Sequence, residues 1–288
     1  MTGQPVVAAV DGSGEALHAA EWAAREARRR SAPLRIVSVA AMPSRMHVRH
    51  SAVSEVAGTA REVAAGAALR AACRVTEIVP GLIVDTDVLT GAPATAVTDS
   101  GCGAVMLVVG ARGLGGFGAM ILGSVSRHAA ANAGCPVVVV REQPSVPRRV
   151  VVVGIRDPRN CGPALPFAFE EAALHGMDLV AIHAWHGITP GRLATDDPLA
   201  DPGLAWAEAR WQIADTLAAW QEKYPTVNAT VEVVQAPAGE VLSIRSANSK
   251  LVVLGRNDRQ RSGRGTGVAH VRRSVLGHAQ GPVAVVPA

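Results

Sequence analysis

The strongest constraint on the fold of this 288-residue chain is that its second half repeats its first. The apolar run at residues 5–10 returns at residues 148–155, an offset of about 145 residues, and a repeat of this length indicates duplicated structural units. Both halves also close alike, with Cys135-Pro136-Val137 in one and Gly281-Pro282-Val283 in the other. The chain is therefore expected to hold two copies of one domain.

Runs of valine, isoleucine and leucine alternate with helical stretches in each half. Further strands are expected at residues 34–40, 82–89 and 105–109 in the first half, and at 179–184, 229–234 and 251–254 in the second. Long amphipathic helices are expected at about 52–73 and about 204–224. Continuous apolar strands that alternate with helices are typical of a doubly wound parallel sheet. The predicted fold class is α/β, with two tandem Rossmann-like domains, each a five-stranded parallel sheet flanked by helices.

The two domains are predicted at residues 1–142 and 148–288, on either side of a short proline-bearing linker. A linker this short should hold the domains against one another.

Composition excludes several classes of protein. Apolar residues make up 49% of the chain and charged residues 18%, so two cores can be buried, whereas a 3% aromatic content argues against a base-stacking nucleic-acid surface. No run approaches the roughly 18–20 apolar residues that a membrane span needs, and Asp11 comes too early for a signal peptide. The four cysteines form no CxxC pair, which favours reduced thiols and a cytoplasmic location.

Candidate functional residues follow the first and fourth strands of the first half. Strand one runs into Asp11, and strand four runs into Gly110-Ala111-Arg112-Gly113, with Gly123-Ser124 following after nine residues. In an open parallel sheet, ligands bind outside the carboxyl ends of the strands where the strand order reverses. Gly110 and Gly113 are expected to permit left-handed turns and close approach of the backbone to a ligand.

A helix is expected to begin near Ser124, so that the amides of Gly123, Ser124 and Val125 are free to bind an anion. The Ser124 hydroxyl would add a hydrogen bond to a phosphate or its metal. Asp11 would accept hydrogen bonds from ribose hydroxyls or approach a phosphate-bound Mg²⁺. The pattern therefore predicts a phosphate site.

This glycine pattern resembles the phosphate motif of the universal stress protein family. It consists of Gly110-x-x-Gly113, followed after nine residues by Gly123-Ser124. The strand that leads into Asp11, the Gly91-Ala92-Pro93 segment and the closing strand resemble that family too. The whole chain is similar to its tandem members in actinobacteria, whose domains are of the adenine nucleotide alpha hydrolase-like type.

The resemblance implies an ATP site with these residues: Asp11, Val39 (main chain, for adenine), Gly110, Gly113, Gly123, Ser124 and Val125. It implies a regulatory stress-response protein that binds ATP with Mg²⁺, forms a homodimer, and hydrolyses ATP slowly or not at all. No catalytic residue and no resident metal site are assigned.

The second half is predicted to have lost most of this site. Asp11 aligns with Arg156 and Val39 with His183, Gly91 becomes Ala236, and Gly123-Ser124 becomes Ala269-His270. Gly255 remains, but Gly113 falls at about Asp258 or Arg259. An arginine cluster could hold an acidic ligand, or be a solvated basic loop: Arg256, Arg259, Arg261, Arg264, Arg272 and Arg273.

Other chemistries are disfavoured. Gly113-x-Gly115-x-x-Gly118 fits a dinucleotide fingerprint but follows the fourth strand, and no acidic residue closes strand two. No P-loop Gly-Lys-Ser/Thr is present, which leaves Arg112 and Arg127 as the nearby cations. The histidines lack companions at metal-ligand spacing, so His183 is expected to be a core or pocket residue.

The first helix and the long helix of the second half carry residues with predicted structural roles. Ser13 is predicted to cap the first helix rather than to act as a nucleophile. Trp206, Trp211 and Trp220, on one long helix, are expected to pack on the sheet or an interface rather than on a ligand.

The leading hypothesis is an ATP-binding regulator in which nucleotide orders the 113–123 loop and changes the surface offered to an unknown protein partner. One alternative is an interaction module that binds no nucleotide, and another is a slow ATPase. The sequence does not separate ATP from other adenine nucleotides, because backbone amides cradle phosphates without counting them.

Overall fold

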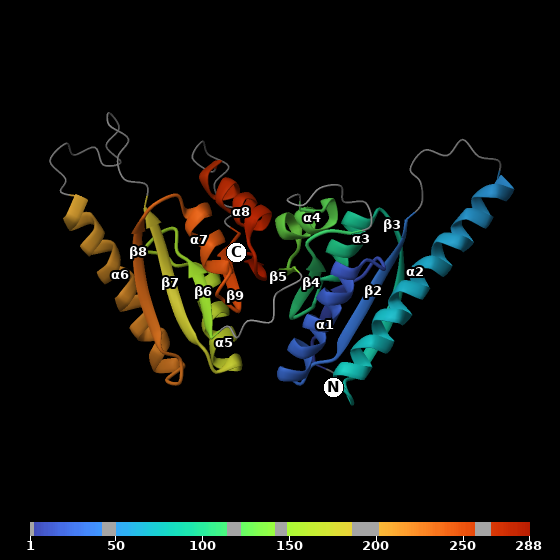
Figure 1. The fold of residues 1–288 in the computed structure, drawn as a ribbon, viewed down its shortest axis with the longest axis horizontal. Helices are drawn as coiled ribbons and strands as arrows, with labels where there is room; N and C mark the ends of the chain where they lie inside the picture. Colours follow the sequence, from blue (N-terminus) through green and yellow to red (C-terminus); the bar gives the residue numbers. More distant parts are fainter. Residues whose placement is uncertain (1–2, 42–49, 114–121, 142–148, 186–201, 257–265) are drawn as a thin grey trace. The chain divides into compact units, whose positions relative to one another are not determined.

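A computed structural model describes residues 3–41, 50–113, 122–141, 149–185, 202–256 and 266–288 of the chain. The chain divides into two compact units, Met1–Glu142 and Gln143–Ala288. Figure 1 labels the helices and strands of each unit. The predicted linker at residues 142–147 lies outside the described residues.

The first unit is a five-stranded parallel sheet in the order β3-β2-β1-β4-β5. Its elements are β1 (Val6–Ala9), α1 (Gly14–Arg29), β2 (Leu34–Ala41), α2 (His50–Ile78), β3 (Val84–Gly91), α3 (Pro93–Ser100), β4 (Met106–Gly110), α4 (Ser124–Asn132) and β5 (Val137–Val140). Helices α1 and α2 pack on one another, as do α3 and α4, so the sheet is covered on two faces. Strand β4 is consequently buried along its whole length, as expected for a central parallel strand.

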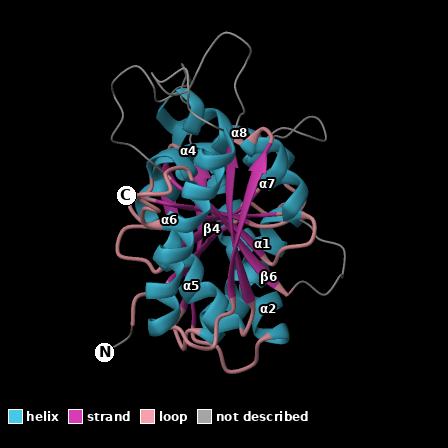
Figure 2. Ribbon diagram, turned by 90° about the vertical axis from the view of Figure 1, so that its left-hand side faces the viewer, coloured by secondary structure: helices cyan, strands magenta, loops and turns pink. Residues whose placement is uncertain are grey.

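The second unit repeats this architecture in the order β8-β7-β6-β9-β10, again with parallel pairs. Its elements are β6 (Val150–Gly154), α5 (Ala164–His175), β7 (Asp178–Trp185), α6 (Pro202–Lys223), β8 (Ala229–Gln235), α7 (Ala238–Ser246), β9 (Leu251–Gly255), α8 (Thr266–His278) and β10 (Val283–Val286). Figure 2 distinguishes the strands from the helices that cover them. The predicted fold class, two tandem five-stranded α/β domains, is confirmed.

Element boundaries differ from the sequence-based expectation mainly at the long helices. Helix α2 continues to Ile78, beyond the expected end near residue 73, because no glycine or proline lies between residue 73 and Pro80. Helix α1 begins as predicted: Ser13 is its N-cap, and the Ser13 hydroxyl accepts a hydrogen bond from the Ala16 amide at 3.2 Å. Within the described residues, no helix is both apolar enough and long enough to cross a bilayer.

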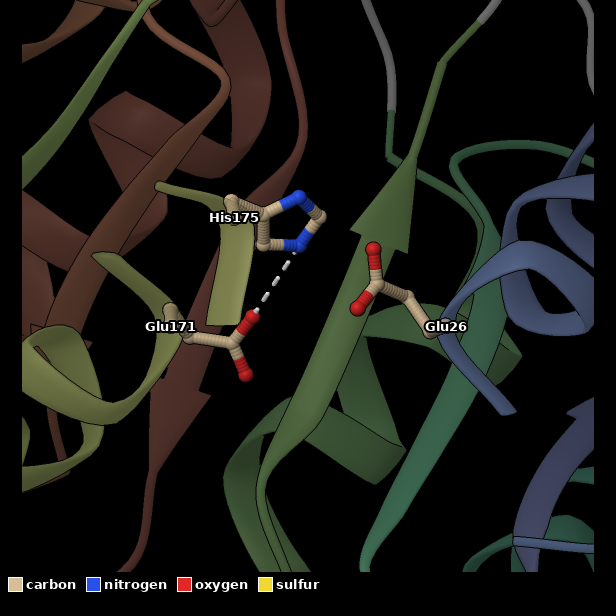
Figure 3. Close-up of side chains that lie close together, drawn as sticks. All are labelled: Glu26, Glu171 and His175. Carbon is tan, nitrogen blue, oxygen red and sulfur yellow. Dashed lines mark ion pairs between the residues drawn. The ribbon is translucent and has the colours of Figure 1, made fainter. Parts of the chain in front are cut away.

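Each unit buries an acidic side chain on the helix that follows its first strand. At the end of α1, the guanidinium of the C-cap residue Arg30 donates to the Glu26 carboxylate at 2.6 Å. In α5 the His175 ring lies 3.7 Å from the Glu171 carboxylate, an i,i+4 pair drawn with a dashed line in Figure 3. These pairs occupy matching positions, since the Ala32 amide donates to Ala27 and the Met177 amide to Ala172. The repeat therefore extends to a buried pair of an acidic and a basic side chain.

The three tryptophans of α6 are placed differently from one another. Trp220 packs in a cluster of three rings with Phe169 and Tyr224, whose centroids lie 6.0 and 6.2 Å from its own and 5.9 Å from one another. The Trp206 ring nitrogen donates to the Val233 carbonyl at 3.3 Å. Trp211 is 76% exposed, so it does not pack on the sheet, and the other expected placement, at an interface, stays a prediction. Its position on the outer face of the helix accounts for the difference.

Candidate functional site

The strand order of the first unit reverses between β1 and β4. From β1 the chain steps outward through β2 and β3, and then returns to β4 on the other side of β1. Ala9 pairs with Val109, so the segments that follow β1 and β4 leave the sheet next to one another. Open α/β sheets bind their ligands at the carboxyl ends of the strands, beside the point where the strand order reverses. Asp11 and Gly110 were predicted to lie there.

A cavity of about 890 Å³ opens at this edge. All seven predicted site residues line it: Asp11, Val39, Gly110, Gly113, Gly123, Ser124 and Val125. Strand β2 reaches the cavity because it continues past the end of its pairing with β1, which stops at Val37. The geometry thus brings together residues from four separate segments of the chain. Residues 114–121 of the predicted phosphate loop lie outside the described part of the structure.

The two described ends of that loop are fastened to one another. The Gly123 amide donates to the Ala111 carbonyl at 2.8 Å, and the buried Ser126 hydroxyl donates to the Gly110 carbonyl at 2.6 Å. The expectation that the Gly123 amide is free is therefore wrong, because Ala111 already uses it. Helix α4 does begin at Ser124, so the amides of Ser124 and Val125 lie in its first turn, where they lack intrahelical acceptors.

Gly110 and Gly113 are required for close approach and not for left-handed turns. Neither has a positive φ, contrary to the sequence-based expectation. A Cβ at Gly110 would lie 3.0 Å from the Glu15 carbonyl carbon and 3.1 Å from the Ala16 nitrogen, so β4 ends directly against the first turn of α1. A Cβ at Gly113 would collide with the Asp11 carboxylate.

Asp11 is exposed at the cavity and is held by its own turn. The Ser13 amide donates to Asp11 Oδ1 at 2.9 Å, while Oδ2 is the atom nearest to Gly113. The carboxylate is thereby oriented between the end of β1 and the phosphate loop. Among the described residues that line the cavity, it is the only carboxylate.

Glu15 is a site-organising residue that the sequence analysis missed. Its carboxylate accepts from the Arg112 amide at 2.8 Å and from Arg112 Nε at 2.6 Å. Burial lowers the pKa of the Arg141 guanidinium just beyond β5, and the Glu15 carboxylate opposes that effect. Glu15 therefore attracts two arginines. No spacing rule reveals this role, because Glu15 and Arg112 are far apart in sequence.

The second unit has a smaller cavity, about 520 Å³, at the corresponding edge of its sheet. Gly154, Ile155, Arg156 and Gly255 line it, and the side chains there differ from those of the first unit. Gly255 has room that Gly110 lacks, since a Cβ would meet only the Ala164 Cβ at 3.8 Å. The predicted positions Asp258 and Arg259 lie outside the described residues.

The backbone register corrects one sequence alignment. The Val10 amide donates to Val37, and the Ile155 amide donates to Ile182, each at 2.8 Å. Val37 therefore matches Ile182, and Val39 matches Ala184 rather than His183. His183 Nδ1 lies 2.9 Å from the Ile155 carbonyl oxygen, and its half-buried ring does not line the cavity. A one-residue slip of this kind reverses which face of the sheet a side chain occupies.

Fold and site together define a tandem pair of doubly wound α/β domains, each with a cavity at the carboxyl edge of its sheet. The profile of the Universal stress protein family matches residues 3–141 and again residues 147–287. The chain belongs to the universal stress protein family, as its motifs predicted.

Relatives of the same tandem length come from mycobacteria. Universal stress protein MT2052 of Mycobacterium tuberculosis is 32% identical over 317 residues, covering 97% of this chain and 94% of that protein. Universal stress protein MT2061 of the same organism is 33% identical over 292 residues, covering 97% and 96%. The resemblance to tandem actinobacterial members is thus confirmed.

A solved structure shares the fold. The crystal structure of a universal stress protein from Archaeoglobus fulgidus has a TM-score of 0.68 and covers 99% of this chain and 96% of that one. At 16% identity, this likeness concerns the fold alone.

Proposed function

We propose that the first unit binds ATP with Mg²⁺ and that the chain acts as a regulatory nucleotide-binding protein of the stress response. The single observation that carries this proposal is the convergence of all seven predicted residues on one cavity at the switch point of the sheet. Its volume of about 890 Å³ lies within the roughly 300–1,000 Å³ typical of small-molecule sites.

The phosphates would lie at the start of α4. The first-turn amides of Ser124 and Val125 are donors, and the helix dipole favours negative charge there. The bonds from Gly123 to Ala111 and from Ser126 to Gly110 fix these donors before a ligand arrives, which lowers the entropic cost of binding. Arg127 lines the same cavity and adds positive charge.

The other residues would orient the nucleoside and the metal. The main chain at Val39 lies past the end of β1, where backbone groups can read an adenine edge. Asp11 and Ser124 would hold Mg²⁺, since carboxylate and hydroxyl oxygens suit that ion and both residues line the cavity. When bound, Mg²⁺ neutralises part of the phosphate charge.

Efficient phosphoryl transfer has little support. In the part of the chain that the structure describes, the lining residues include one carboxylate, Asp11, and no lysine. Kinases and rapid ATPases combine cationic clamps with a residue that positions the nucleophile. The chain is therefore proposed to be a binding protein whose hydrolysis, where present, is slow.

A thermal shift on the full chain tests the nucleotide site. Millimolar Mg-ATP should raise the melting temperature of the wild type, because a ligand that binds only the folded state stabilises it. Gly123→Glu should abolish the shift, since the new side chain places negative charge at the first turn of α4. Ala269→Glu, at the matching position of the second unit, is the control and should keep it. An unchanged wild-type melting temperature would refute the proposal.

Mass spectrometry of small molecules released from the denatured protein separates the remaining alternatives. Recovery of an adenine nucleotide supports the proposal and identifies which nucleotide is held. An interaction module that binds no nucleotide would release none.

The proposal extends to a cytoplasmic homodimer that docks an unidentified protein partner. Light scattering with and without Mg-ATP tests the dimer, which should have twice the mass of the chain. A monomer under both conditions would contradict the proposed dimer and would leave the proposed nucleotide site untouched.

A further inference from the structure

Two arginines line the cavity of the first unit, one on each side of the loop at residues 113–123. Arg112 precedes the loop and Arg127 follows it. Glu15 accepts hydrogen bonds from both the amide and the guanidinium of Arg112. Within the described residues, the Arg127 guanidinium has no hydrogen bond and no ion pair. The described residues therefore balance the charge of Arg112 and leave that of Arg127 unbalanced.

The loops nearest to the cavity in sequence supply no acidic partner for Arg127. Residues 114–121, which join the two arginines, include no charged side chain. Residues 42–49, which follow β2, include two arginines and no aspartate or glutamate. An anionic ligand in the cavity is therefore a suitable partner for Arg127.

The position of Arg127 on α4 is unfavourable without an anion. The Arg127 amide donates to the Gly123 carbonyl at 3.0 Å, so this residue closes the first turn of the helix. The N-terminal end of a helix carries partial positive charge, which repels a cation. No acidic residue lies in the first turn of α4, whereas the first turn of α1 carries Glu15. A bound phosphate would offset both the dipole and the guanidinium.

Arg127 shares a face of α4 with Ser124. Residues three apart are neighbours on a helix surface, and both of these residues are exposed and line the cavity. Between them, Ser126 is buried and its hydroxyl donates to the Gly110 carbonyl. That bond orients the helix, so a phosphate at the Ser124 amide lies within reach of the long Arg127 side chain.

The strand order places Arg127 at the phosphate end of the cavity. Val39 lies on β2, Asp11 follows β1 and Gly110 ends β4, and these three strands are neighbours in the order β2-β1-β4. A nucleotide with its base at β2 and its ribose at β1 extends its phosphates past β4 toward α4. The phosphate farthest from the base is therefore the one that meets Arg127.

We propose that Arg127 binds the terminal phosphate of the nucleotide and makes the first unit selective for ATP over ADP and AMP. This inference rests on the ATP site proposed above. The amides of Ser124 and Val125 bind a phosphate group whatever the number of groups attached to it. A guanidinium beyond them adds a bidentate, charge-assisted contact only when a further phosphate reaches it.

Isothermal titration calorimetry of the full chain with ATP, ADP and AMP, each with Mg²⁺, tests this role. The wild type should bind ATP about tenfold more tightly than ADP. Arg127→Gln should weaken ATP binding about tenfold and ADP and AMP binding less than about twofold, because only the terminal contact is lost. Arg127→Lys should weaken ATP binding about threefold, because the charge remains but the planar fork does not.

Arg273→Gln is the matched control in the second unit. Ala133 follows α4 as Ala279 follows α8, and each amide donates to the carbonyl four residues earlier. This register matches Arg273 with Arg127. Arg273 is exposed and does not line the cavity of the second unit. Its substitution should therefore leave the affinity for ATP within about twofold of the wild type.

The melting temperature of the nucleotide-free variants separates ligand binding from a structural role. Arg127→Gln should melt no lower than the wild type, because it removes a cation from the positive end of a helix. A melting temperature lower than that of Arg273→Gln would make Arg127 a structural residue and would overturn the inference.

The titrations also distinguish failure of this inference from failure of the proposed function. If the wild type binds ATP, ADP and AMP alike, or if Arg127→Gln weakens all three alike, the role of Arg127 is wrong and the nucleotide site stands. If the wild type binds none of the three, the proposed function fails and this inference fails with it.

Discussion

The cavities of the two units are built on the same strand order and carry contrasting side chains. Asp11, Ala111 and Ser126 line or support the first, and Arg156, Arg256 and Arg272 occupy the matching positions in the second. The buried pairs Glu26–Arg30 and Glu171–His175 are alike in placement. The comparison teaches that the sheet and its helices fix where a ligand cavity forms, whereas a few side chains at the strand ends decide its charge.

The start of the first helix in each unit adds to the contrast. By the helix-end register Ala164 matches Ala19, yet α5 begins at Ala164 and α1 begins at Gly14. The first turn of α1, which carries Glu15, therefore has no helical counterpart. Asn160, Cys161 and Gly162 line the second cavity from that stretch instead. The second unit thus lacks the carboxylate that holds Arg112 in the first.

The largest expected effect on ATP affinity comes from giving the first cavity the residue that the second unit has at the matching position. Asp11→Arg should weaken Mg-ATP binding by at least about 100-fold, or about 2.7 kcal/mol. It removes the acceptor for Mg²⁺ or ribose and forces a longer side chain against Gly113. Isothermal titration calorimetry measures the change. Arg156→Gln should leave ATP affinity unchanged, and an Asp11→Arg affinity within threefold of wild type would contradict the assigned role.

The next effect separates two glycines at matching strand ends. Gly110→Ala should cost about 2 kcal/mol, because its Cβ meets the backbone of α1, which cannot move aside. Gly255→Ala should change stability by less than about 0.5 kcal/mol, because its nearest neighbour is a methyl group at ordinary contact distance.

Hydrogen exchange of β4 and β9 peptides in a urea series reports these two substitutions separately, which matters in a chain of two domains. Equal destabilisation by both would show that the close approach at Gly110 is unimportant.

A smaller effect is expected at the residue that has no counterpart in the second unit. Glu15→Gln should destabilise the first unit by about 1 kcal/mol, because charge-assisted bonds to the half-exposed Arg112 are weakened. The same exchange measurement applies, with Glu62→Gln on the exposed face of α2 as the control. If Glu15→Gln lowers the free energy of unfolding no more than Glu62→Gln does, Glu15 does not stabilise the site.

The smallest effect concerns the thiol of the second cavity. Because burial raises the pKa of Cys161, its thiolate forms at a higher pH, and its alkylation rate should rise at a higher pH than that of a free peptide thiol. Thr216→Val removes the hydrogen bond that opposes this effect and should shift the profile further upward. A profile that moves to lower pH would contradict the described environment.

Much of the fold was predictable from sequence because it rests on local patterns. Uninterrupted valine runs predicted the buried parallel strands, and the repeat predicted that both units have the same succession of strands and helices along the chain. The end of α2 was placed too early, because a β-branched stretch around Val75 weakens the helical pattern although nothing breaks the helix before Pro80.

The site was predictable only where it depends on residue type and spacing. The motif predicted residues that line one cavity. It could not predict the contacts between residues on different strands and helices. Glu15 and Ser126 act through Arg112 and Gly110, and only the folded strands bring these residues together. The match of Val39 to Ala184 rests on backbone hydrogen bonds that no alignment contains. The roles of Gly110 and Gly113 required knowing what a Cβ would meet.

The stoichiometry of Mg-ATP binding to the full chain tests the central claim most directly. Isothermal titration calorimetry should give one site per chain, and Gly123→Glu should remove it while Ala269→Glu retains it. Two equivalent sites, or a single site lost in Ala269→Glu, would contradict the assignment of nucleotide binding to the first unit alone.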